Sequence, residues 1–171
     1  MSDEIIVRED NTQVQSASSQ PMRLIEMALA NNADIDKLER LMEMQRQWDA
    51  RDAKKQFLDA LCRFQAQCPT ILKKKHGHNY KYAPLADIVE QVKGVIASCG
   101  LSYRFEQDHS NGIRVTCVIS HSAGHSETNS MVAMPDTSGS KNAIQAIGSA
   151  VQYLMRYTFV GGFGITTADE E

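Results

Sequence analysis

The sequence predicts an α+β fold in which a three-stranded antiparallel β-meander packs with helices and follows a long helix and a basic hairpin. Apolar residues recur every three or four positions over residues 35–67 and 85–96, as they do on one face of a helix. Residues 101–134 instead alternate between apolar and polar side chains, as strands do. Because another helical pattern follows the strands, the elements together indicate an α+β domain.

The first twenty residues are rich in acidic, Ser, Gln and Asn side chains and lack periodicity. We expect residues 1–20 to form a disordered tail ahead of a single core domain over residues 21–171. A short helix is expected to begin at Pro21 and to stop near Asn31. The N-terminus has no basic segment followed by an apolar one, and no stretch approaches the about 20 apolar residues of a membrane helix. We therefore expect a cytoplasmic protein with no membrane partner.

A long helix is expected from Ile35 to about Gln67. Asp34 suits its N-cap, and Pro69 follows its expected end. Three aromatic side chains recur in it at helical spacing, which favours a place in the core or a subunit interface over stacking on bases: Trp48, Phe57 and Phe64.

A basic hairpin or mobile loop is expected over Ile71–Tyr82, with Gly77 between two short arms. The net charge of the chain is −3, yet residues 37–81 carry eleven basic and five acidic side chains. Cations and aromatic rings interleave in the hairpin: Lys73, Lys74, Lys75, Tyr80, Lys81 and Tyr82. Single-stranded nucleic acid favours this mixture, because cations contact its backbone and rings stack on its bases. The alternative is a solvated basic loop with core tyrosines.

A helix and three strands are expected next. The helix starts at Pro84 and ends at Gly100. The strands alternate apolar and polar residues from Leu101 to Glu106, from Ile113 to Ser120 and, more weakly, from His125 to Met134. Their turns are expected at Asn111-Gly112 and Ala123-Gly124.

The last helix is expected from about Ser138 or Ser140 to Phe159, and the glycines at 161, 162 and 164 are expected to end it. Its apolar face is predicted from four residues: Ile144, Ile147, Val151 and Leu154. A polar stripe runs along another face: Lys141, Gln145, Ser149, Gln152 and Arg156.

Sequence patterns of an enzyme are absent. The run Ser138–Lys141 lacks the upstream glycine of a phosphate-binding loop, so it indicates a helix cap or, alternatively, amides and a lysine that hold a DNA phosphate. No cluster of carboxylates suggests metal-dependent cleavage. His121 and His125 flank a turn without ligand partners at suitable spacing, so we expect no metal and no cofactor. The cysteines have no CxxC spacing and are expected to be small buried side chains: Cys62, Cys68, Cys99 and Cys117.

Four separated motifs resemble the essential recombination function (ERF) family of phage single-strand DNA annealing proteins. They are Tyr80–Ile88, Gly100–Tyr103, Asp136–Ala150 and Tyr153–Tyr157, and the likeness extends over Ile35–Glu171. The β-β-β-α core also resembles that of the wider superfamily of ring-forming annealing proteins. The resemblance implies annealing of complementary single strands without ATP on a homo-oligomeric ring or filament. A phage exonuclease and a host single-strand binding protein are candidate partners.

In that superfamily DNA lies between the basic hairpin and the helix that follows the meander. Carried over to this chain, together with the aromatic ring of the hairpin, this implies a set of DNA-binding residues: Lys73, Lys74, Lys75, Tyr80, Lys81, Lys141, Gln145, Gln152 and Arg156. Three alternatives remain: a single-strand binder that does not anneal, a nuclease or other DNA enzyme, and a structural oligomer whose hairpin is only a subunit contact.

Overall fold

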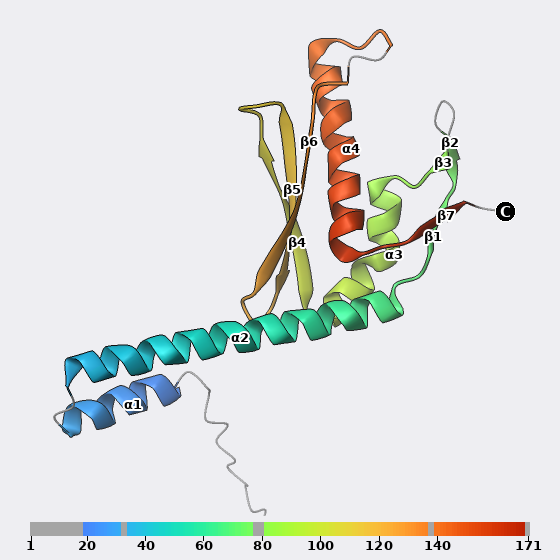
Figure 1. The fold of residues 1–171 in the computed structure, drawn as a ribbon. Coiled ribbons are helices and arrows are strands. Elements are labelled where there is room, and N and C mark those ends of the chain that lie inside the picture. Colours follow the sequence, from blue (N-terminus) through green and yellow to red (C-terminus); the bar gives the residue numbers. More distant parts are fainter. Residues whose placement is uncertain (1–18, 32–33, 77–80, 137–138, 170–171) are drawn as a thin grey trace, which may run out of the picture. The chain divides into compact units, whose positions relative to one another are not determined.

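The computed structural model describes residues 19–31, 34–76, 81–136 and 139–169, which form the helices and strands of Figure 1. The disordered tail expected over residues 1–20 lies almost entirely outside the described residues. The chain divides into two compact units, residues 1–48 and residues 49–171. None of the helices in the described ranges is long and apolar enough to cross a membrane.

The first unit contains α1 (Ser19–Ala30) and the beginning of α2 (Ile35–Gln67). The predicted bounds of the long helix are confirmed, and Asp34 starts it as expected: its Oδ1 accepts a hydrogen bond from the Asp36 amide at 3.2 Å. Trp48 is 70% exposed, so the expectation that it lies in the core is wrong for this chain. The alternative, a subunit interface, stays a prediction.

The second unit contains a three-stranded antiparallel sheet with packed helices, which confirms the predicted fold class. After α2, its elements are β1 (Ile71–Lys73), β2 (Lys75–His76), β3 (Lys81–Tyr82), α3 (Leu85–Ser98), β4 (Leu101–Asp108), β5 (Ile113–His121), β6 (Ser126–Ala133), α4 (Ala143–Phe163) and β7 (Thr167–Asp169). The sheet order is β4-β5-β6, and Cys117 in the central strand pairs with Phe105 and Asn129. Gly112 and Gly124 adopt positive φ angles of 85° and 96° at the two turns.

Helix α4 lies along one face of this sheet (Figure 1). It begins later than predicted, because Asn142 is the N-cap and forms a reciprocal capping box with Gln145. The predicted apolar face is partly wrong, since Ile144 is 82% exposed and Ile147 is also exposed. The buried face is instead formed by Ala146, Ala150, Leu154 and Thr158. Two alanines leave room for the helix to approach the sheet closely, which outweighs the burial of larger isoleucines.

Of the three glycines predicted to end α4, Gly161 and Gly162 lie within the helix, and only Gly164 ends it. A Cβ atom on Gly161 would lie 2.8 Å from Asn129 Nδ2, and one on Gly162 would lie 2.9 Å from Ile119 Cδ1. Both glycines therefore allow the helix backbone to touch the sheet. The helix ends at Gly164, whose φ of 69° places it in the left-handed region.

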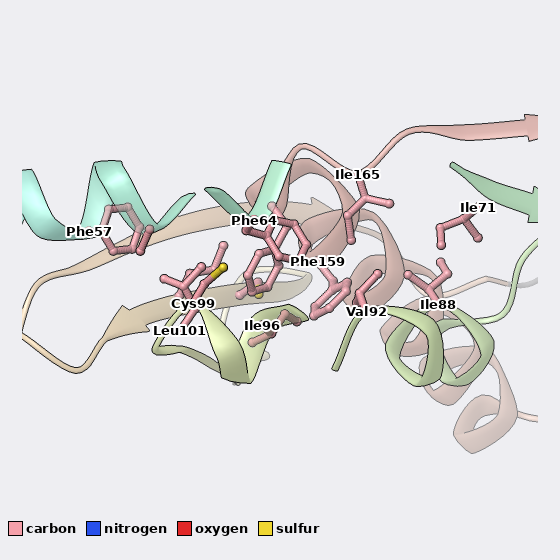
Figure 2. Packing of buried hydrophobic residues seen from close by; sticks show 14 of the residues in the cluster. Phe57, Phe64, Ile71, Ile88, Val92, Ile96, Cys99, Leu101, Phe159 and Ile165 are labelled. Carbon is pink, nitrogen blue, oxygen red and sulfur yellow. The ribbon is translucent and has the colours of Figure 1, made fainter. Parts of the chain in front are cut away.

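The main core gathers side chains from α2, β1, α3, the sheet and α4 (Figure 2). Phe57 and Phe64 of α2 are buried in it, which confirms the prediction for these two residues. Cys99 and Cys117 are buried as expected, but Cys62 is exposed.

The basic segment divides into two small sheets. Only β2 and β3 form the antiparallel hairpin, with Lys75 paired to Tyr82, and Gly77–Tyr80 lie outside the described residues. Strand β1 pairs in parallel with β7, so that Lys73 stands opposite Asp169. The hairpin predicted over Ile71–Tyr82 is therefore shorter than expected.

Candidate nucleic-acid interface

A groove of about 550 Å³ lies beside α4 in the second unit. Three parts of the chain line it: Tyr82, Pro84 and Leu85 around the start of α3; Ala133, Met134 and Asp136 after β6; and Ser149, Ala150, Gln152, Tyr153 and Arg156 on α4. Helix α4 thus forms one wall, and the end of the basic hairpin lies across from it. This is the pairing of elements that the family resemblance implied.

Arg156 stands among three tyrosine rings. Its guanidinium carbon lies 5.0 Å from the ring centroid of Tyr82, 5.4 Å from that of Tyr153 and 5.0 Å from that of Tyr157. Among the described residues, no carboxylate lies within ion-pair distance of this guanidinium. A planar, weakly hydrated guanidinium stacks on rings in a way that an ammonium group does not. Arg156 therefore brings a positive charge to the groove that no described acid neutralises.

The groups around Tyr157 lower the pKa of its hydroxyl below the ordinary value. A hydrogen bond from Tyr153 makes the largest contribution to lowering the pKa of Tyr157, and the nearby charges of Arg156 and Lys73 lower it further, while burial opposes them. Among the described residues that line the groove, Arg156 is the cation beside these rings, while Lys73 pairs with Asp169.

The lysines of the basic segment do not all face the groove. Lys73 pairs with Asp169 at 3.5 Å, whereas no ion pair joins Lys74 or Lys75 to a carboxylate in the described parts of the chain. Lys75 stands opposite Tyr82 in the β2–β3 pair, so both side chains lie on the same face of the ribbon. Lys81 precedes Tyr82 in β3, and alternation along the strand directs it to the other face. Tyr80 lies outside the described residues.

The polar stripe at the start of α4 is occupied by local interactions. The Asp136 carboxylate accepts hydrogen bonds from the Lys141 ammonium group and, at 2.8 Å, from the Ser149 hydroxyl. Gln145 is part of the capping box, although it remains exposed. Gln152 is exposed and lines the groove. The charge of Lys141 is thus matched by Asp136, which sequence reasoning did not anticipate.

The two histidines near the second turn have structural surroundings. The His125 ring packs edge-on against Phe57, with centroids 5.2 Å apart, and His121 Nδ1 accepts a hydrogen bond from the Ala123 amide at 3.2 Å. Within the described residues, no three His, Cys, Asp or Glu side chains are grouped so that they could hold a metal ion.

The site also includes residues that the sequence did not single out. Tyr153 and Tyr157 were recognised only as part of a family motif, and Asp136 only as the start of another. The spacing of the two tyrosines, four residues apart on a helix whose buried face lies elsewhere, was the available signal.

The sequence model of the ERF superfamily matches residues 57–171, which include the sheet, α4 and every described residue that lines the groove. No curated protein and no solved structure matches the chain.

Proposed function

Since the chain belongs to the ERF superfamily, we propose that it binds single-stranded DNA and anneals complementary strands without ATP, in phage-type homologous recombination. The observation that carries this proposal is the groove, where Arg156 stands among three tyrosine rings. Cations in such a groove contact the sugar–phosphate backbone and leave the base edges free to pair with a second strand. The proposed activity is therefore binding and not catalysis.

The salt dependence of binding tests the electrostatic part of this proposal. If Lys73, Lys74, Lys75 and Arg156 each contact a phosphate, log affinity falls against log salt with a slope of about −3, from about −0.7 per contact on single strands. Replacing the three lysines together by Ala reduces the slope to about −0.7. A matched control removes three lysines outside the basic segment, Lys54, Lys55 and Lys93, and leaves the slope near that of the parent. Equal effects of both triple variants would contradict the assignment.

Annealing distinguishes the proposal from a protein that only coats single strands. Two complementary labelled strands are mixed with the protein in the absence of ATP, and duplex formation is followed by energy transfer. Acceleration above the spontaneous rate is expected. Binding without acceleration would favour the alternative, a single-strand binder that does not anneal.

Arg156→Lys tests whether the planar guanidinium matters beyond its charge. The variant keeps the charge but loses both stacking on three rings and bidentate contact with a phosphate. We expect slower annealing and weaker single-strand affinity. Unchanged values of both would show that Arg156 acts only as a positive charge.

We also propose that copies of the chain assemble into a homo-oligomeric ring or filament. Within the described residues, β4 and β6 are the two edges of the sheet, and each pairs only with β5. Exposed apolar side chains on α2, including Met44 and Trp48, offer further surface. Light scattering with and without DNA tests this, and a single 19.0 kDa species in both conditions would contradict it.

A further inference from the structure

Tyr153 and Tyr157 form an exposed pair of rings on α4. They lie four residues apart, and their centroids are 4.3 Å from each other with a tilt of 37°. The two residues are 47% and 41% exposed, although the sheet lies against the same helix and could have covered aromatic side chains. Tyr is also one of the weaker helix formers, so neither burial nor helix propensity accounts for two tyrosines at these positions.

The rings are held in place before any ligand binds. Arg156 contacts both rings, and it also contacts Tyr82, which belongs to β3. A cation is attracted to the faces of the aromatic rings that it contacts. The pair is thus fixed between its own helix and the end of the hairpin, and little conformational entropy remains to be lost when a ligand stacks on it.

The surroundings of the pair define the chemistry of its ligand. Tyr153 lines the groove, and the guanidinium of Arg156 brings a positive charge to both rings. A flat aromatic ligand with an attached anion satisfies both the rings and the cations. An unpaired nucleotide has this combination, because its base stacks on rings of any kind and its phosphate pairs with cations.

We propose that Tyr153 and Tyr157 are a stacking platform for an unpaired base of the bound strand, with Arg156 beside its phosphate. This inference rests on the proposed function and adds to it a named base-binding element. The tyrosines of α4 would then contact the bound DNA in addition to the lysines of the hairpin.

The test compares an ordinary single strand with a strand of equal length that carries abasic sites throughout its central part. Tyr153→Ala and Tyr157→Ala are each expected to weaken binding of the ordinary strand by about 5- to 100-fold, the range found when a base loses one aromatic partner. The same variants bind the abasic strand as the parent does, because no base is present to stack. The slope of log affinity against log salt stays unchanged, since no phosphate contact is removed.

Four further variants separate stacking from folding. Tyr153→Phe and Tyr157→Phe keep the rings and retain parental affinity. Tyr153→Leu keeps apolar bulk without a flat ring, so it loses affinity as the alanine variant does. Ile144→Ala is the control, because Ile144 is an exposed apolar residue on α4 that does not line the groove. It changes neither the affinity for the ordinary strand nor the affinity for the abasic strand.

Two results would overturn the platform. Equal weakening of the ordinary and abasic strands by the alanine variants would mean that the rings only position Arg156, and unchanged binding of both strands would mean that they do not contact DNA. A parent protein that binds neither strand overturns the proposed function itself, and is thereby distinguished from both results.

Discussion

Asp136 restrains the cation that lies closest to the start of α4. Its carboxylate accepts from Lys141 and Ser149, and its backbone amide donates to the Ala146 carbonyl at 3.1 Å. The substitution Asp136→Asn keeps the shape of the side chain and the backbone hydrogen bond but removes the negative charge. Lys141, which also donates to the Ser149 hydroxyl at 3.4 Å, then loses its acidic partner, and we expect it to contact a phosphate of the bound strand.

The expected gain follows from one additional phosphate contact. Each such contact on a single strand releases about 0.7 counterions, so the slope of log affinity against log salt steepens by about 0.7. At roughly 0.1 M salt the same term corresponds to an affinity increase of about fivefold. The substitution also removes the Lys141–Asp136 ion pair, in which the two side chains are 32% and 35% exposed. This ion pair contributes at most about 1 kcal/mol to stability.

Fluorescence anisotropy of a labelled single strand, measured between about 50 and 200 mM salt, gives both quantities. The double variant Asp136→Asn with Lys141→Ala is the control, and it returns the slope to that of the parent. The reasoning is refuted if the single variant has the parental slope, or if the double variant keeps the gain. In the latter case the removal of repulsion, and not the release of Lys141, would account for the tighter binding.

Three other predictions concern stability, thiol reactivity and pH. Gly148→Ala is expected to raise the free energy of unfolding by about 0.8–1 kcal/mol, because nothing lies within 4 Å of the added Cβ. Gly162→Ala is expected to lower the free energy of unfolding by about 1–3 kcal/mol, because its Cβ overpacks the contact with the sheet. Urea unfolding measures both changes. Cys62 should react rapidly with a thiol reagent, but burial raises the pKa of Cys117 to about 11, so this thiol reacts only when the protein unfolds. The pKa of Tyr157 lies below its ordinary value in the folded state. As the pH rises from this lowered pKa to about 10, the folded state therefore becomes more stable. Over the same pH range Tyr157 gains a negative charge beside the groove. Single-strand affinity should therefore fall over this alkaline window in the parent and not in Tyr157→Phe.

Elements with local causes were predictable from the sequence. The long helix begins at its capping residue, Asp34, and the central strand alternates buried and more exposed residues from Ile113 to Cys117. The continuation of α4 through Gly161 and Gly162 was not predictable, because glycines usually stop helices and these two allow contact with the sheet at Asn129 and Ile119. That contact depends on how the helix packs on the sheet, and the residues next to Gly161 in the sequence give no information about this packing.

The candidate site was predictable only in outline. The sequence indicated the two elements that form the groove and named Arg156 and Gln152, both of which line it. It could not show that Asp136 neutralises Lys141, or that alternation in a two-residue strand turns Lys81 away from Tyr82. Such pairings depend on side-chain directions that only the assembled fold defines.

The parallel pairing of β1 with β7 has a consequence for the order of folding. The sheet strands join through short turns, whereas β1 and β7 bring together Ile71 and Thr167, which are separated by almost the whole second unit. Closing a loop of roughly this length costs about 4 kcal/mol in chain entropy, more than three-residue strands can recover on their own. This pairing should therefore form after the meander and α4 have docked, and its amides should exchange with solvent before those of β5. The β1–β7 pair, which includes Lys73, is then expected to be the last part of the unit to assemble and the first to open.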